Sequence, residues 1–210
     1  MIAERAYAEL RDRIVTLRLA PGTVLREDEL MRELDIGRTP LREAVKRLAL
    51  ENLVIVQPRS GTFVTSVDAA DIVHISEVRA ELEAHAAELA ARRMDAATRE
   101  RAEALLDRAR GHEGAGSADA LMQLDEAIHR VVWDGARNPY LSETLERYFA
   151  LSLRVWYLVL DRVPGLGATV FDHARLLEAV LDGDARRAGD LMREHVVEFE
   201  REIMAAFSRD

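Results

Sequence analysis

Four side chains in the later part of the sequence have the types and the spacing to hold a metal ion together. Asp125 and His129 are four residues apart, so in a helix they lie on one face and can bind the same ion. His173 and His195 each recur with apolar residues at helical spacing, which places both on faces that pack into a core. Both lie about ten residues from the turn expected at 181–184, so they face each other in an antiparallel helix pair.

This set of residues has two interpretations. A lone histidine on an apolar face is most often a core residue whose hydrogen bonds are satisfied. Four polar groups that point into one interior are different, because burying each without a partner carries a large free-energy cost. The chain has no cysteine, and imidazole and carboxylate ligands suit Zn²⁺, Ni²⁺, Mn²⁺ or Fe²⁺. We therefore expect one divalent metal ion, with open positions for water or a ligand carboxylate.

Six long amphipathic segments are expected to position these residues. Apolar periodicity predicts helices at 69–93, 96–112, 117–135, 138–162, 168–182 and 185–208. The breaks GHEGAG, GARNP, VPGLG and LDGD separate most of them. In the last break, Gly183 is expected to end one helix and Asp184 to cap the next. Residues 67–210 are therefore predicted to form an all-α six-helix bundle.

The first 66 residues predict a different fold. Helices are expected at 2–18, 27–34 and 39–52. Thr39 is the expected N-cap of the third helix, with Pro40 at its first position. Two β-rich runs follow, joined by a turn at 58–61 that indicates a hairpin. Three helices and a hairpin favour a winged helix-turn-helix domain at 1–66, so the predicted fold class of the whole chain is mainly α.

Charge is distributed unevenly between these two parts. The formal net charge is -9, yet residues 1–66 carry 11 cations and 10 acids, against 18 and 28 in the remainder. Arg38, Arg42 and Lys46 recur at helical spacing, opposite an apolar stripe, and Arg59 lies at the tip of the predicted hairpin. An ordinary solvated helix face is the alternative. The position of these cations on the third helix favours DNA contact. A nearly neutral domain can still bind DNA when its cations gather on one face, because phosphate contacts are local and screened beyond ~8–10 Å.

Between Leu19 and Val64, the stretches LAPGTVLREDEL, IGRTPLREAVKRLALENLV and PRSGTFV resemble the GntR superfamily of bacterial transcription regulators. Gly37 stands where that family commonly has Ser or Thr, so one hydroxyl contact to a phosphate or base is in question. With this resemblance, the candidate DNA-binding residues are Arg38, Thr39, Arg42, Lys46, Arg59 and Gly61.

The second part resembles the FCD effector domain of the FadR-type branch, through VRAELEAHAAELAA, LDEAIHRVVWDGARNPYL and DHARLLEAVLDGDARRAGDLMREHV. Six helices favour the VanR-like subgroup. Arg79 matches an arginine typical of the start of this domain, and either clamps an effector carboxylate or pairs with Glu83. Arg154 either lines the same pocket or forms a surface ion pair. The resemblance places the metal ligands on Asp125, His129, His173 and His195.

These resemblances imply a homodimeric, ligand-responsive transcription regulator, most often a repressor. It would read a palindromic operator in double-stranded DNA and sense a small organic acid. A cytoplasmic protein without a membrane segment is expected, because no apolar run approaches the ~20 residues that span a bilayer. The only lysine, Lys46, has no Gly-rich loop before it, which argues against a P-loop nucleotide site.

An enzyme is the rival from another class. A metal-dependent hydrolase or isomerase would use the same Asp/His set, with the N-terminal domain as an appendage. Glu126 is the nearby acid that could serve as a general base, but helical phase turns it away from Asp125 and His129. A sequence-tolerant architectural DNA binder is a third reading, and it does not explain an acidic second domain larger than the first.

Overall fold

The computed structural model describes residues 2–111, 118–159 and 166–207. Its internal contacts divide the chain into two compact units. Unit 1 comprises Met1–Asp68 together with the segment Ala150–Leu158, and unit 2 comprises Ala69–Phe149 together with Val159–Asp210. Among the described residues, no helix combines the length and the apolar character that crossing a membrane requires.

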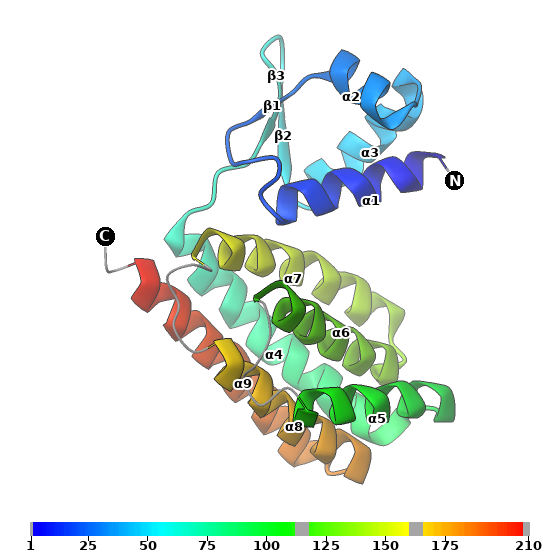
Figure 1. The fold of residues 1–210 in the computed structure, drawn as a ribbon, viewed down its shortest axis with the longest axis vertical. Coiled ribbons are helices and arrows are strands. Elements are labelled where there is room, and N and C mark those ends of the chain that lie inside the picture. The colour runs from blue at the N-terminus through cyan, green and yellow to red at the C-terminus, as the bar shows by residue number, and fades with distance from the viewer. Residues whose placement is uncertain (1, 112–117, 160–165, 208–210) are drawn as a thin grey trace. The chain divides into compact units, whose positions relative to one another are not determined.

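Unit 1 contains a winged helix-turn-helix, as the sequence predicts (Figure 1). Its elements, in chain order, are α1 (Ile2–Val15), β1 (Val24–Leu25), α2 (Glu27–Leu34), α3 (Arg38–Leu50), β2 (Val54–Gln57) and β3 (Gly61–Val64). The three strands form one antiparallel sheet in the order β1-β3-β2, with Ile55 opposite Phe63. The strand β1 was not expected, because two residues are too few to show a strand pattern.

The core of unit 1 is built where α1 packs on α3. Leu10 and Ile14 of α1 and Leu41 and Leu48 of α3 are fully buried. Each such side chain contributes about 2 kcal/mol through the apolar surface removed from water. The same packing leaves the opposite face of α3 exposed, including Arg42.

The start of α3 differs from the sequence expectation. The N-cap is Gly37, with an extended backbone and no side-chain cap, so the prediction that Thr39 is the cap is wrong. Pro40 is the third residue of the helix and not the first. Proline is tolerated there because the amides of the first helical turn have no carbonyl partner within the helix. The effect is to move Arg38 and Thr39 into the first turn.

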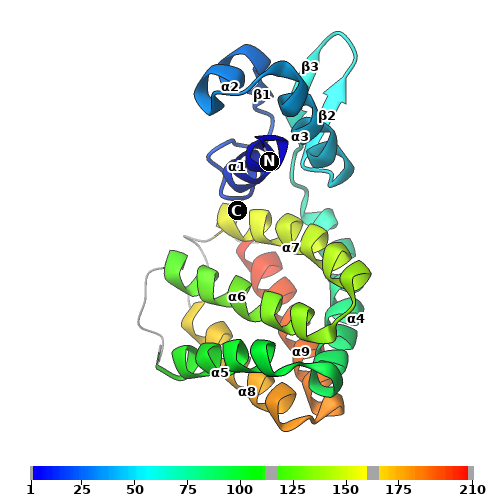
Figure 2. The ribbon, with the colours of Figure 1, turned by 90° about the vertical axis from the view of Figure 1, so that its right-hand side faces the viewer.

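Unit 2 is all-helical, and its predicted helices are confirmed within two or three residues at the described ends. They are α4 (Ala69–Arg93), α5 (Ala96–Gly111), α6 (Ala118–Ala136), α7 (Pro139–Val159), α8 (Leu166–Asp182) and α9 (Ala185–Phe207), and part of α7 is grouped with unit 1. Helix α4 packs against α9 and α6, and α8 packs against α5 and α9 (Figures 1 and 2). The breaks expected at GHEGAG and VPGLG lie largely outside the described residues.

The buried face of α4 consists largely of small side chains. Val78 is 39% exposed and His85 is exposed, whereas Ala80, Ala84 and Ala87 are buried. Small side chains allow α4 to approach α6 and α9 closely. This close packing brings the backbone of α4, and the two charged side chains on its buried face, near the residues of α6.

The turn between α8 and α9 forms as predicted. Gly183 has a φ of 77°, the left-handed conformation that glycine adopts without strain. The side chain of Asp184 caps α9, since its Oδ1 accepts a hydrogen bond from the amide of Arg187 at 3.1 Å. The tight turn makes the two helices neighbours, and the ring centroids of His173 and His195 are 4.2 Å apart.

Candidate metal centre and DNA-binding surface

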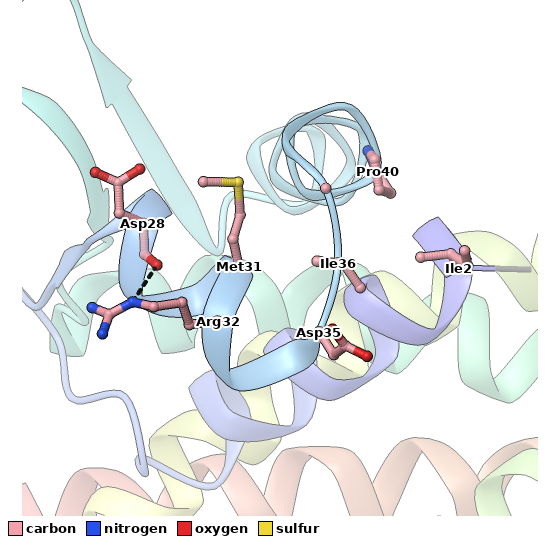
Figure 3. A pocket seen from close by; sticks show the side chains of 8 residues that line it. Ile2, Asp28, Met31, Arg32, Asp35, Ile36 and Pro40 are labelled. Atoms are coloured by element: carbon pink, nitrogen blue, oxygen red, sulfur yellow. Dashed lines mark hydrogen bonds between the residues drawn. The ribbon is translucent and has the colours of Figure 1, made fainter.

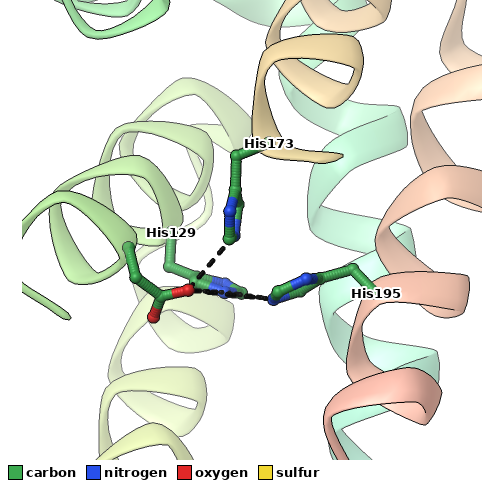
Figure 4. Close-up of side chains that lie close together, drawn as sticks. His129, His173 and His195 are labelled. Carbon is green, nitrogen blue, oxygen red and sulfur yellow. Dashed lines mark hydrogen bonds and ion pairs between the residues drawn. The ribbon is translucent and has the colours of Figure 1, made fainter. Parts of the chain in front are cut away.

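Three helices bring Asp125, His129, His173 and His195 to one place, with α6 supplying the first two (Figure 4). Each residue offers one ligand atom, and these four atoms lie within 4.8 Å of one another. The Oδ1 of Asp125 lies 3.2 Å from Nε2 of His173 and 3.9 Å from Nε2 of both His129 and His195. The Nε2 atoms of His129 and His195 are 3.2 Å apart. All four residues expected from the spacing therefore converge.

The cluster is closed off from solvent, with exposed fractions between 1% and 9%. Burial, together with the neighbouring His173 and His129, lowers the pKa of His195 well below its usual range. His195 is therefore neutral at pH 7, and a neutral imidazole is the form that binds a metal ion. His195 therefore offers a ligand nitrogen without a proton that would compete with an ion.

Glu83 of α4 lies beside this cluster and was missed as a functional residue. Its side chain is fully buried, and its Oε2 lies 2.7 Å from Nδ1 of His129. The indole Nε1 of Trp133 donates to the same oxygen at 2.9 Å. Burial by itself would raise the pKa of Glu83, but the charges of His129 and Arg79 and the hydrogen bonds from His129 and Trp133 lower that pKa to about 2. Glu83 is therefore an anion inside the helical unit.

Arg79 pairs with Glu83, which was one of its two expected roles. Its Nε and Nη2 donate to Oε1 of Glu83 at 3.0 and 2.6 Å, and the side chain is 3% exposed. The guanidinium carbon lies 4.9 Å from the ring centroid of Phe149. Among the described residues, Nη1 has no hydrogen-bond acceptor. The Nη1 group of Arg79 therefore keeps N–H donors that can bind a ligand.

Arg154 lies among the residues grouped in unit 1. Its Nη1 donates to Oγ1 of Thr65 at 2.7 Å, and its Nη2 donates to the backbone oxygen of Thr65. The residue is 1% exposed, so the alternative of a surface ion pair is wrong. Burial lowers the pKa of Arg154 to about 10. Its role in effector binding stays a prediction.

A signal for Glu83 was present in the sequence. An acid that shares a helical face with Ala80, Ala84 and Ala87 must be buried when that face packs, and a buried carboxylate needs donors. Its partners His129 and Trp133 belong to α6, and their contact with Glu83 depends on how the two helices pack.

The six candidate DNA-binding residues of unit 1 are all exposed. Two arginines of α3 lie near acids of α2, with Arg38 3.6 Å from Asp28 and Arg42 3.6 Å from Glu27. These ion pairs are solvent-exposed and therefore weak, so a phosphate or a base edge can replace them at low cost. Lys46 forms no ion pair with any described residue.

The turn of the wing follows from two backbone conformations. Gly61 has a φ of 114°, a value that favours glycine, and Arg59 has a φ of 68°. The left-handed residues reverse the chain between β2 and β3 and hold Arg59 exposed at the turn. The turn thus supplies one further cation to unit 1.

An open hollow of about 710 Å³ lies between α2 and the start of α3 (Figure 3). Met31, Ile36 and Pro40 supply its apolar wall. Its charged side chains are exposed, and the Nε of Arg32 donates to the backbone oxygen of Asp28. The hollow lacks the converging buried donors and acceptors that hold a small ligand, and it contains none of the predicted site residues.

Comparison with known proteins matches both parts of the chain. Residues 2–64 match the family model described as bacterial regulatory proteins, gntR family, and residues 74–198 match the FCD domain. An uncharacterized HTH-type transcriptional regulator of Streptomyces ambofaciens, from an unstable DNA locus, is 31% identical over 90% of this chain and 80% of its own length. The HTH-type transcriptional repressor RspR of Escherichia coli K12 is 26% identical over 96% and 89%.

Solved structures show the same fold. The chain superposes on E. coli McbR/YncC with a TM-score of 0.82, at 20% identity, covering 100% of this chain and 98% of the other. A putative GntR transcriptional regulator of Rhodococcus sp. RHA1 gives a TM-score of 0.74, at 24% identity over 97% of each chain.

A winged helix-turn-helix with exposed cations on its third helix, in one chain with a helical domain that has a buried polar centre, defines the class of two-domain DNA-binding transcription regulators. Within that class, the chain belongs to the GntR family and carries an FCD domain. The two relatives named above are described as an HTH-type transcriptional regulator and an HTH-type transcriptional repressor.

Proposed function

We propose that this chain is a cytoplasmic, homodimeric repressor that binds a palindromic operator and releases it when a small organic acid binds its helical unit. One observation carries the proposal: four buried atoms of metal-ligand type converge in one domain, while the other domain exposes the candidate DNA-binding cations. A regulator needs two such sites, because an effector changes operator affinity only by favouring one of two conformations.

The Asp125/His129/His173/His195 cluster fits a resident divalent metal ion. Three imidazole nitrogens and one carboxylate oxygen suit Zn²⁺, Ni²⁺, Mn²⁺ or Fe²⁺. When bound, the ion supplies a fixed positive charge that can take a carboxylate oxygen of a ligand. The four residues hold and orient it, while burial excludes bulk water from all three imidazoles.

The metal in this proposal is ligand-holding and not catalytic. Glu126, the acid considered as a general base, donates no group to the cluster, because its Oε1 accepts from Nε of Arg130 at 3.0 Å on the outside of α6. A metal-dependent hydrolase or isomerase would therefore lack Glu126 as a general base beside the cluster. The relatives, which are transcription regulators, favour the same conclusion.

Arg79 is the proposed second contact for the acid. The Nη1 edge of its guanidinium offers donors, and a carboxylate can accept from Nη1 and Nη2 as a bidentate pair. Rings of Phe149 and Phe199 lie near the guanidinium, which favours a ligand with an apolar part. A small carboxylate would thus contact the proposed metal ion on one side and the guanidinium of Arg79 on the other.

Dimerisation supports operator recognition, because two winged domains related by a two-fold axis match the half-sites of a palindrome. The proposed readers of each half-site are the exposed cations of α3 and of the wing. Analytical ultracentrifugation at micromolar concentration should give twice the mass of one chain, and a monomer with and without DNA would contradict this part.

The experiment that tests the proposed function is a measurement of carboxylate binding with and without operator DNA. A screen of small organic acids by thermal shift supplies the ligand. A coupling of ~1–3 kcal/mol would change its affinity about 5- to 150-fold when operator is added, by the reciprocity of linkage. Arg79→Ala should lose the acid, whereas Arg193→Ala, which removes an exposed arginine paired with Glu81, should keep it. An acid whose affinity is the same with and without operator DNA is not the effector.

A further inference from the structure

Glu83 connects two parts of the helical unit that the proposed function treats separately. Its two carboxylate oxygens have different partners. Oε1 accepts both hydrogen bonds from Arg79, at 3.0 and 2.6 Å. Oε2 faces Nδ1 of His129 at 2.7 Å and accepts from Trp133 at 2.9 Å. Three side chains therefore hold one fully buried carboxylate in a single orientation.

The contact with His129 determines where the imidazole proton lies. Oε1 of Glu83 accepts two hydrogen bonds from Arg79 and Oε2 accepts one from Trp133, so the carboxylate acts as an acceptor and Nδ1 of His129 donates across the 2.7 Å distance. A metal ion binds the neutral imidazole, in which only one nitrogen carries the proton, so Nε2 of a ligating His129 presents its lone pair. Nε2 is the atom that lies 3.2 Å from Nε2 of His195 and 3.9 Å from Oδ1 of Asp125.

We propose that Glu83 is a positioning residue for the metal site: it fixes the tautomer and the ring orientation of His129, so that Nε2 points at the ion. This inference rests on the proposed metal site. A carboxylate that accepts from the outer nitrogen of a ligating histidine also increases the basicity of the inner one. Arg79 and Trp133 keep the carboxylate in place, which makes Arg79 a supporting residue of the metal site as well as a candidate ligand contact.

The structure offers few other ways to orient the ring of His129. Its Nδ1 has Glu83 as its only hydrogen-bond partner among the described residues. Its remaining neighbours are the rings of Phe149, Trp133, His173 and His195, with centroids between 4.9 and 5.9 Å away. Those ring contacts restrict the ring but favour neither tautomer, and the 3.2 Å contact between Nε2 of His129 and Nε2 of His195 does not fix which of those two nitrogens is the donor. The tautomer therefore depends on Glu83.

A substitution of Glu83 alone would leave Arg79 buried without a counterion, which strongly destabilises the fold. The test therefore uses two double variants, Arg79→Met/Glu83→Gln and Arg79→Met/Glu83→Met. Both remove the buried charges, and Gln and Met have nearly the same length. They differ in the acceptor that they offer, since the Gln carbonyl can accept from Nδ1 of His129 and from Trp133, and the Met side chain can accept from neither.

Dissociation constants for Co²⁺ alone, measured by competition with a chromophoric chelator, should differ between the two double variants. Loss of such an outer partner typically costs about 10- to 100-fold in metal affinity, so the Met variant should bind Co²⁺ at least ~10-fold more weakly than the Gln variant. The visible Co²⁺ absorption bands should shift in the Met variant. Glu81→Gln, which changes an exposed acid of the same helix paired with Arg193, should match the parent.

A second readout needs no metal. In ¹⁵N spectra of the metal-free parent, His129 should be protonated at Nδ1, and the Met variant should show the Nε2–H form. Equal Co²⁺ affinities for the Gln and Met variants, or an Nε2–H tautomer in the parent, would overturn the role of Glu83 while leaving the metal site intact. A parent that binds no Co²⁺ would overturn the metal site itself, and this inference with it.

Discussion

The two units place their functional residues in opposite environments. In unit 1 the candidate DNA-binding cations are exposed on α3 and on the turn of the wing, and their ion pairs with α2 are long and solvated. In unit 2 the candidate metal ligands and their neighbours Glu83 and Arg79 are buried. A surface that meets a large polyanion can leave its charges in water until the partner arrives. A site for a small ion must instead supply all compensating contacts from within the fold.

This difference predicts that function and stability are separable in unit 1 and inseparable in unit 2. An exposed arginine on α3 contributes to binding and contributes little to folding. A buried charge in unit 2 contributes to both, because removing its partner leaves an uncompensated ion in the core. Substitutions of the same residue type in the two units should therefore behave differently.

The largest expected effect comes from a matched pair of arginine substitutions. Arg79→Met leaves the carboxylate of Glu83 buried without its cation, so the free energy of unfolding should fall by about 3–5 kcal/mol. Arg42→Met removes an arginine whose side chain is 60% exposed and should change that free energy by less than ~0.5 kcal/mol. Urea denaturation followed by circular dichroism measures both. Equal effects for the two variants would remove the contrast between the units.

A smaller effect is expected in operator binding. Arg42→Ala should weaken operator binding by ~1–3 kcal/mol if its guanidinium reaches a base edge. Lys46→Ala should instead weaken binding to DNA of any sequence by a similar factor. It should also reduce the slope of log affinity against log salt by about 1, because one phosphate contact is lost.

Fluorescence anisotropy over a salt series distinguishes the two results. Arg186→Ala serves as the control, because it removes a fully solvated arginine of α9 in unit 2. Parent-like affinity of the Arg42 variant for the operator would show that α3 is not the reading surface.

The smallest predicted effect concerns alkaline pH in unit 1. The hydroxyl of Tyr7 donates to Oε1 of Glu51 at 2.6 Å, and burial together with this hydrogen bond raises the pKa of Tyr7 to about 12. A raised pKa in the folded state means that the stabilisation is fully present below pH 10 and is lost as the pH rises through 12.

Tyr7→Phe should therefore lower the free energy of unfolding by about 1 kcal/mol at pH 7. The difference between parent and variant should shrink from pH 10 upward. Urea denaturation at several pH values checks this, and a constant difference up to pH 11.5 would show that the hydroxyl does not stabilise unit 1.

Much of the fold and of the metal cluster could be predicted from the sequence because both depend on local spacing. A four-residue interval fixes Asp125 and His129 on one face of α6, and a glycine followed by an aspartate fixes the turn that brings His173 and His195 together. Apolar periodicity likewise gave the helix bounds.

The parts that could not be predicted depend on how elements pack. The strand β1 is short and forms only because Val24 and Leu25 pair with β3. The buried face of α4 follows from close packing of alanines and not from the largest apolar residues. Glu83 acquires its role only when α4 and α6 bring its carboxylate to His129. No interval in the sequence encodes that contact.

Metal content per chain tests the central claim most directly. Protein purified without chelators and analysed by plasma mass spectrometry should contain about one divalent ion per chain, since ligands that form only in the folded state bind as a unit. His195→Ala and Asp125→Ala should lose most of it while keeping their helical circular dichroism, whereas His85→Ala, which changes an exposed histidine of α4, should keep it. Equal metal content in the parent and in His195→Ala would contradict the account.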